Sequence, residues 1–280
     1  PERYSHQTHL TAMDPIIILG ILLALLFNFA NGLNDAANSI ATIIATKALS
    51  PLQAVLLAGV FNLLGPLLFT TAIAATIGRG LVDPAFLTPP MILMAMVGAV
   101  LWVLATSYLG IPVSSSHALI GGLLGAGIAA AGMGVVFWPS LTAIGQVLFY
   151  GAVGAVLGAI GTSAYTLRKG EFAPWHLFLG GLIGVTLLIP SAIVLGFLKI
   201  NGILAILIFI VISPTLGLIS AFAFGILVTR AFRDYPPRRL NNLFRNLQIF
   251  SGSLQAVGHG GNDAQNAMGI ITAMLLAGGL

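Results

Sequence analysis

Long apolar segments separated by short polar ones run through the whole chain. Four stretches contain no Asp, Glu, Lys or Arg: residues 48–78, 84–167, 172–198 and 200–229. About 20 apolar residues suffice for one helical crossing of a bilayer, so each stretch predicts one or more membrane-spanning helices. The alternating segments of about 10 residues that mark an outer-membrane β-barrel do not occur. The pattern therefore predicts an all-α, polytopic membrane protein, because a helix satisfies its own backbone hydrogen bonds in lipid.

Breaks inside the apolar segments come at sites that contain Gly, Asn or Pro. The predicted helices cover residues 16–47, 52–77, 91–109, 113–131, 141–167, 175–197, 202–229 and 247–257. Breaks are expected at residues 31–35, at Gly110-Ile-Pro112, at Ser213-Pro214 and at residues 259–263. A row of glycines in the fifth helix predicts close helix packing, within the chain or in a homo-oligomer: Gly151, Gly154, Gly158 and Gly161.

The composition agrees with a membrane protein and excludes several other classes. Charged residues make up 6% of the chain, hydrophobic residues 58%, and the mean hydropathy is +1.04. A soluble domain has roughly 25% charged residues, so a soluble enzyme of this composition would lack a polar surface. The absence of Cys excludes a disulfide scaffold. The high apolar content excludes a disordered chain.

Basic residues lie in two clusters that orient the chain. Five Arg residues occur within residues 230–245, and Arg168 and Lys169 form the other cluster. Basic loops stay on the cytoplasmic side of a membrane, so both clusters are expected in the cytoplasm. Two apolar segments separate them, which returns the chain to the same side. Counting spans from there places residues 131–138 and the N-terminus outside.

One motif occurs twice, 228 residues apart. Gly32-Leu-Asn34-Asp35-Ala-Ala-Asn38 and Gly260-Gly-Asn262-Asp263-Ala-Gln-Asn266 both read G-x-N-D-A-x-N. The chain enters the two copies from opposite faces, so we expect an inverted-topology repeat with broken helices or re-entrant hairpins. The chain then divides into a polar N-terminal segment (1–14), the first repeat with the helices that follow it (15–229), an Arg-rich cytoplasmic loop (230–245) and the start of the second repeat (246–280).

Two carboxylates lie at membrane depth, where a charge is costly. Asp35 and Asp263 have apolar surroundings, and burying each costs roughly 2.5–3.5 kcal/mol on insertion scales. Asn38 and Asn266 follow three residues later, on the same helix face. Together with carbonyls freed at the Gly break, these oxygens form a cage that suits Na⁺, or the carboxylates carry a proton. The alternative is that Asn-Asp only caps a helix N-terminus.

A second polar motif, Pro112-Val-Ser114-Ser115-Ser116-His117, opens the helix predicted over residues 113–131. Hydroxyls and free N–H groups at a helix N-terminus bind anions, aided by the helix dipole. Three serines supply the donors that a compact tetrahedral oxyanion needs, and His117 is an auxiliary donor or a structural residue. Two alternatives are an ordinary Ser cap and a hydrolase in which Ser115 or Ser116 acts with His117, although no G-x-S-x-G context occurs.

Together these motifs resemble the inorganic phosphate transporter (PiT) family of phosphate symporters, over roughly residues 13–280. The resemblance implies a secondary transporter, not an enzyme, that imports inorganic phosphate across the plasma membrane with Na⁺ or H⁺ as coupling ion and no other cofactor. It implies that phosphate is bound by Ser114, Ser115, Ser116, Asn34 and Asn262. It implies that the cation, Na⁺, is bound by Asp35, Asn38, Asp263 and Asn266, with Ser213 as an auxiliary candidate.

Two other transport functions fit the same side chains. A sulfate symporter fits because sulfate shares the size and tetrahedral geometry of phosphate. An anion channel fits a pathway lined by donors, although paired inverted repeats favour alternating access over a continuous pore.

The sequence departs from the family pattern in one respect. The family carries a second serine–histidine motif downstream of its second N-D motif. Ser114 lies 79 residues after Asp35, whereas 17 residues follow Asp263. We therefore expect that this chain is a fragment, or that its last spans are missing from this sequence, so that half of the phosphate pocket is absent.

Overall fold

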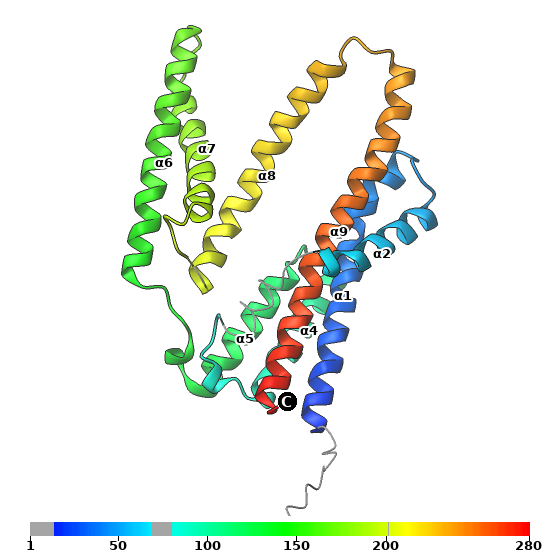
Figure 1. Cartoon of the computed structure of the whole chain (residues 1–280), viewed down its shortest axis with the longest axis vertical. Coiled ribbons are helices and arrows are strands. Elements are labelled where there is room, and N and C mark those ends of the chain that lie inside the picture. Colours follow the sequence, from blue (N-terminus) through cyan, green and yellow to red (C-terminus); the bar gives the residue numbers. More distant parts are fainter. Residues whose placement is uncertain (1–13, 69–79, 201) are drawn as a thin grey trace, which may run out of the picture. The chain divides into compact units, whose positions relative to one another are not determined.

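The computed structural model describes residues 14–68, 80–200 and 202–280, and they form helices joined by short loops (Figure 1). Six of these helices are long and apolar enough to cross a membrane. The all-α, polytopic membrane fold that the sequence predicts is therefore confirmed. The chain divides into two compact units. The first contains residues up to Val136 together with Leu243–Leu280, and the second is Phe137–Asn242.

The first unit is built from α1 (Pro15–Ala45), α2 (Pro51–Leu68), α4 (Pro89–Leu109), α5 (Ser115–Ala131) and most of α9 (Pro237–Ala277), with short 3₁₀ turns at Pro84–Phe86 and Met133–Val135. α1 begins where the Asp14 carboxylate accepts a hydrogen bond from the Ile16 amide at 2.9 Å. α4 and α5 pack as a helical hairpin, and Gly122 approaches the backbone at Ala95 so closely that a Cβ would not fit.

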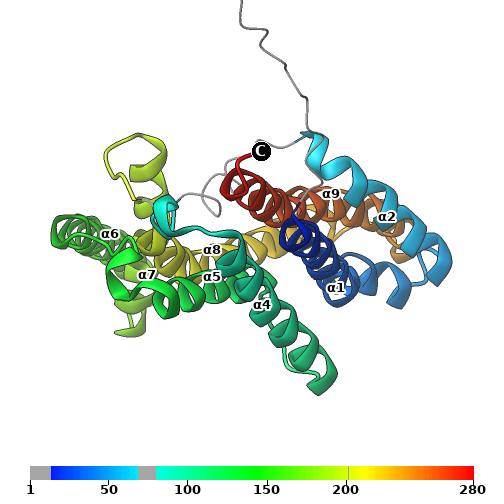
Figure 2. The ribbon, with the colours of Figure 1, turned by 90° about the horizontal axis from the view of Figure 1, so that it is seen from below.

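α1 and α9 lie side by side and antiparallel (Figure 1, Figure 2). One register holds along α1, as five contacts show: Ile17 with Gly278, Gly20 with Met274, Asn31 with Asp263, Ile43 with Gly252, and Thr46 with Gln248. The repeated motif lies within both helices. The antiparallel register therefore places its two copies next to each other, running in opposite directions.

Both helices run through the motif without a break. α1 is continuous from Pro15 to Ala45 and α9 from Pro237 to Ala277, so the breaks predicted at residues 31–35 and 259–263 are wrong. A continuous helix keeps its backbone groups bonded where water is scarce, which outweighs the roughly 1 kcal/mol cost of a helical Gly. Two consequences follow. Within α1 and α9 the motif frees no carbonyls for a cation, and Asn34-Asp35 does not cap a helix N-terminus.

Of the two other predicted breaks, the one at Gly110-Ile-Pro112 occurs and the one at Ser213-Pro214 does not. α4 ends at Gly110, which has a left-handed backbone (φ 68°), and α5 begins at Ser115, as the Gly110-Ile-Pro112 signal predicts. Ser213-Pro214, by contrast, lies inside the continuous helix α8 (Gly202–Phe232). The predicted span 52–77 corresponds to α2 up to Leu68, and its remainder lies outside the described residues.

The second unit contains α6 (Leu141–Arg168), α7 (Trp175–Val194) and α8. Gly154 and Gly158 of α6 meet the backbone of α7 at Gly180 and Gly184, with no room for a Cβ at any of the four. The close packing predicted from the glycine row is confirmed, and its partner is a helix of the same chain. The loop predicted over residues 230–245 is mostly helical, because α8 extends to Phe232 and α9 begins at Pro237.

Candidate functional site

The two motif aspartates meet between α1 and α9. The Nε2 atom of His259, on α9, lies 2.9 Å from Asp263 Oδ2 and 3.5 Å from Asp35 Oδ2. All three side chains are largely removed from solvent, with 17–28% of each exposed. Like charges this close repel each other, so the pair of carboxylates needs a positive group or a cation between them. The sequence predicts both aspartates at the site, but it does not predict that one histidine joins them.

The contacts between the two motif copies are reciprocal. Asn31 and His259 each lie four residues before the aspartate of their own copy, on the same helix face. Asn31 Nδ2 donates a hydrogen bond to Asp263 Oδ2 at 2.6 Å, and His259 lies beside Asp35. Each copy therefore supports the carboxylate of the other. This exchange requires the antiparallel register of α1 and α9.

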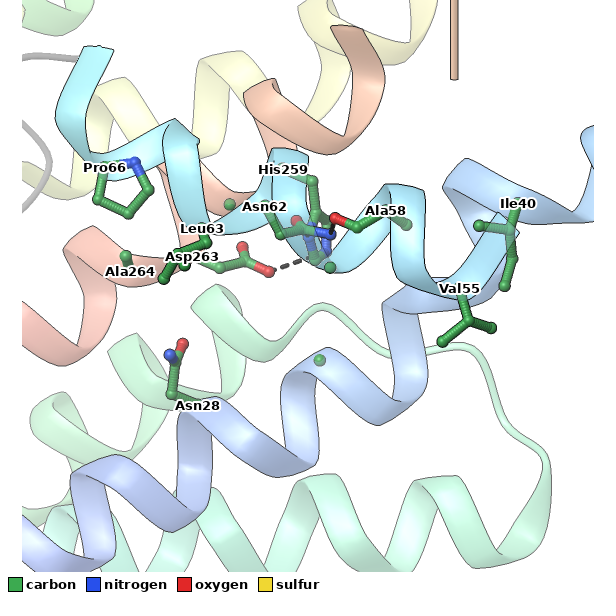
Figure 3. A pocket seen from close by; sticks show the side chains of 13 residues that line it. Asn28, Ile40, Val55, Ala58, Asn62, Leu63, Pro66, His259, Asp263 and Ala264 are labelled. Carbon is green, nitrogen blue, oxygen red and sulfur yellow. Dashed lines mark hydrogen bonds and ion pairs between the residues drawn. The ribbon is translucent and has the colours of Figure 1, made fainter. Parts of the chain in front are cut away.

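α2 holds the imidazole of His259 in place. Asn62 Oδ1 lies 3.0 Å from His259 Nδ1, and Asn62 Nδ2 donates to the Ala58 carbonyl at 2.8 Å. Figure 3 shows Asn62 and His259 next to each other, with Asp263 facing the ring. The two helices approach this closely because Gly65 and Gly260 lie at their crossing, where a Cβ on either would clash with backbone. Glycine in the second motif is therefore needed for close packing against α2.

The amides predicted at the site reach three different partners. Asn38 Nδ2 donates to Asp35 Oδ1 at 3.3 Å, so the predicted proximity of these two residues is present, although Asn38 is exposed. Asn34 Oδ1 accepts a hydrogen bond from Ser107 of α4 at 2.8 Å. Asn266, only 1% exposed, donates from Nδ2 to Ser116 Oγ at 2.9 Å. The last bond brings the serine motif to α9, one helical turn from Asp263.

Three buried amide atoms around this cluster have no hydrogen-bond partner. They are the acceptor oxygens of Asn31 and Asn266 and the donor nitrogen of Asn34. A buried polar atom without a partner is costly, and a bound ligand or a water molecule can complete its bonding. Oxygens suit a cation and an N–H group suits an anion. The roles of Asn266 at a cation and of Asn34 at phosphate stay predictions.

The serine motif begins α5 and has divided roles. Ser114 Oγ accepts a hydrogen bond from the His117 backbone amide at 3.4 Å, which is the ordinary cap that the sequence leaves open as an alternative. Ser115 is buried and Ser116 bonds to Asn266. Ser114 and His117 also line a cavity of about 540 Å³ between α4 and α5.

A second cavity, of about 470 Å³, lies between α1, α2 and α9, and His259 and Asp263 line it (Figure 3). Most of its wall is apolar. Its polar side chains are Asn28, Asn62, His259 and Asp263. His259 and Asp263 of the carboxylate cluster therefore border a cavity whose other polar side chains are the amides of Asn28 and Asn62.

Comparisons with known proteins show which family the chain is related to. A sequence model of the phosphate transporter family matches residues 31–170 and 146–278. This chain belongs to that family. A Rhizobium meliloti protein named "Probable low-affinity inorganic phosphate transporter" is 36% identical over 269 residues, and a Bacillus subtilis protein of the same name is 35% identical over 273 residues. Each match covers 96% of this chain and, respectively, 62% and 63% of the relative.

One solved structure also resembles this chain. The protein described as "The sodium-dependent phosphate transporter" is 25% identical, with a TM-score of 0.56 over 94% of this chain and 68% of that protein. The family predicted from G-x-N-D-A-x-N and P-V-S-S-S-H is therefore confirmed. The chain spans a little under two thirds of the length of the first curated relatives.

Several predicted site residues of the first unit make no hydrogen bond to this cluster in the described part of the chain, among them Ser114, His117 and Asn262. Asn262 is exposed on α9, and Ser213 is exposed on α8 in the second unit. Four residues that do take part were missed in the sequence: Asn31, Asn62, Ser107 and His259. Helical spacing could have identified Asn31 and His259, because each lies one turn before its aspartate. The sequence around Asn62 and Ser107 contains no motif that would identify either residue as part of the site.

Proposed function

We propose that this phosphate transporter family member imports inorganic phosphate across the plasma membrane in symport with Na⁺. The observation that supports the proposal best is the junction of the two motif copies, where Asp35 and Asp263 face each other one turn from the Ser116–Asn266 bond. The cation would bind between the carboxylates. Phosphate would bind at the start of α5, with Asn34 as a further donor. The names of the relatives favour phosphate over sulfate as the anion.

The adjacency of the two proposed sites gives a physical reason for coupling. Phosphate is an anion, and two nearby carboxylates repel it until a cation neutralises part of their charge. Bound Na⁺ would therefore raise the affinity for phosphate, and bound phosphate would raise the affinity for Na⁺ by the same factor. The oxygens of Asp35, Asp263 and Asn266 are the kind of ligand that a hard cation prefers. The description of the solved relative as sodium-dependent supports Na⁺ over H⁺.

We also propose that the two motif copies belong to an inverted-topology repeat. The antiparallel pairing of α1 and α9 supports this, because two copies that pack side by side in opposite directions are related by an approximate two-fold axis. Repeats of this type place the substrate site at their interface near the membrane midplane. Alternating access would then change the packing around the α1–α9 junction, and the pathway would not be an open channel.

Radiolabelled phosphate uptake by cells that express the protein tests this function. We expect uptake to require Na⁺ at fixed pH and to stop when choline replaces it. Asp35→Asn and Asp263→Asn should each reduce uptake to background, because each leaves one carboxylate to hold the cation. Asp234→Asn is the matched control, since Asp234 is 89% exposed in the turn between α8 and α9. Undiminished uptake in both motif variants would overturn the proposed cation site, and competition by sulfate as strong as by phosphate would overturn the substrate.

A further inference from the structure

The cluster between α1 and α9 contains a nitrogen ligand as well as oxygens. His259 Nε2 and one carboxylate oxygen each of Asp35 and Asp263 all lie within 4.8 Å of one another. Na⁺ prefers oxygen ligands, whereas imidazole nitrogen is a preferred ligand of first-row transition cations. We infer that these three residues form a binding site for a divalent transition-metal cation of the Zn²⁺ and Co²⁺ type, and that such an ion competes there with the coupling cation.

The separations between the ligand atoms fit such an ion. Zn²⁺ binds His nitrogen at about 2.0–2.1 Å and carboxylate oxygen at about 2.0–2.2 Å, so neighbouring ligands of a tetrahedral site stand roughly 3.3 Å apart. The distances from His259 Nε2 to the two carboxylate oxygens are 2.9 and 3.5 Å, on either side of that value. His259 Nε2 is also buried, and the two carboxylates are its polar neighbours among the described residues. Small side-chain rotations would therefore complete three ligand positions.

A fourth ligand is available next to the three. Asn31 is 1% exposed, its amide nitrogen is bonded to Asp263, and its amide oxygen is buried without a partner. Because both atoms belong to one amide group, the free oxygen lies close to the carboxylate that would bind the metal. Zn²⁺ sites with three protein ligands keep a fourth position for water, and the Asn31 amide oxygen is placed to bond to that water or to replace it. The cluster is thus more than a pair of acidic residues.

Asn62 prepares the histidine for this role. Its amide nitrogen donates to the Ala58 carbonyl, which leaves its oxygen to accept from His259 Nδ1. A hydrogen on Nδ1 directs the Nε2 lone pair toward the two carboxylates, which is the arrangement a metal-binding histidine requires. Asn62 is therefore a positioning residue. The close crossing of Gly65 and Gly260 holds it at the correct distance.

The metal site shares Asp35 and Asp263 with the proposed Na⁺ site, and in this sense it rests on the same residues as the proposed function. It does not depend on transport. Na⁺ would use the oxygens alone, whereas the transition cation would also use His259. Binding measured without phosphate therefore separates the two ideas. If the protein does not bind the metal, the proposal of Na⁺-driven uptake still stands. If the protein does not take up phosphate, the proposed metal site still stands.

Titration of the purified, tag-free chain with Co²⁺, followed by visible absorption, tests the inference. We expect the intense bands of tetrahedral Co²⁺ to saturate at one equivalent. His259→Gln should abolish these bands, and Asn62→Ala should weaken Co²⁺ binding about 10- to 100-fold, the usual effect of removing the partner of a metal-binding histidine.

Two controls make the test specific. His176→Gln removes a histidine of α7 whose Nδ1 accepts from the Ala173 amide, and Asn246→Ala removes an exposed amide of α9. Both should bind Co²⁺ as the unsubstituted protein does. Gel filtration establishes that each variant is folded. Tetrahedral bands that persist unchanged in folded His259→Gln, or an Asn62→Ala variant indistinguishable from Asn246→Ala, would overturn the inference.

Discussion

Two neighbouring serines at the start of α5 have different partners, so the same substitution should affect them differently. Ser114 caps the helix through the His117 amide, whereas Ser116 accepts from Asn266 at 2.9 Å. The first bond stabilises one helix end. The second joins α5 to α9 beside the carboxylates. Residue type and spacing alone do not separate these roles, because all three serines of the motif look equivalent in the sequence.

We expect Ser114→Ala to lower the stability of the protein by about 1 kcal/mol, the usual cost of losing a cap, with little change in the phosphate KM. Ser116→Ala should raise the phosphate KM by roughly 10-fold, as the loss of one hydrogen bond to a charged ligand does. Thermal unfolding in detergent and the concentration dependence of uptake measure the two effects. The reverse assignment of the two phenotypes would contradict the division of roles.

The sequence locates the carboxylates of the site but not the residues that join them. Asp35 and Asp263 are identifiable because charges at membrane depth are costly. His259 is not identical in the two motif copies, since its counterpart in the first copy is Asn31, so the repeat alone does not identify it. Asn62 lies on α2, far from either copy in sequence. Its role arises from a helix crossing, which a local pattern does not encode.

At the scale of whole helices, the apolar composition predicts where a helix forms better than it predicts whether that helix is interrupted. The apolar segments predict α4, α6 and α7 to within a few residues. The same reasoning misplaces the breaks at residues 31–35 and 259–263, because Gly weakens an isolated helix but is tolerated in a packed one. In α2 and α9 several glycines allow neighbouring helices to pack closely. Gly65 and Gly260 lie where these two helices cross, and Gly252 packs against Ile43 of α1. A helical Gly is therefore ambiguous until its neighbours are known.

Two glycines on different faces of α9 provide a matched test of this packing. Gly260→Ala would place a Cβ against the backbone of Asn62, whereas Gly258→Ala would meet nothing within 4 Å. We expect the first substitution to destabilise the protein by about 1–3 kcal/mol, as overpacking does. The second should be neutral or slightly stabilising, because Ala favours a helix over Gly. Thermal unfolding of both variants in the same detergent measures the difference, and equal stabilities would contradict close α2–α9 packing.

At the scale of the whole molecule, the six candidate spans and the basic clusters together define a proposed orientation. The Arg-rich segment around the α8–α9 turn is expected in the cytoplasm, and the loop between α5 and α6 outside. Many large apolar side chains on these helices are exposed within the chain, as surfaces that face lipid require. The orientation follows from charge alone, so it needs an independent test.

The absence of Cys from the chain makes that test simple. A single Cys is introduced by Gly134→Cys, in the loop before α6, or by Asp234→Cys, in the α8–α9 turn. We expect a membrane-impermeant maleimide to label the first variant in intact cells and the second only after permeabilisation. The opposite labelling pattern would reverse the orientation, and labelling of both in intact cells would contradict the span count between them.

Equilibrium binding of radiolabelled Na⁺ to the purified protein tests most directly whether the two motif copies build one cation site. Binding should be saturable in the unsubstituted protein and in Asp234→Asn. Asp35→Asn and Asp263→Asn should each abolish it, because the carboxylates from α1 and α9 share one ion through the contacts around His259. Saturable Na⁺ binding that survives in either single motif variant would contradict a shared site.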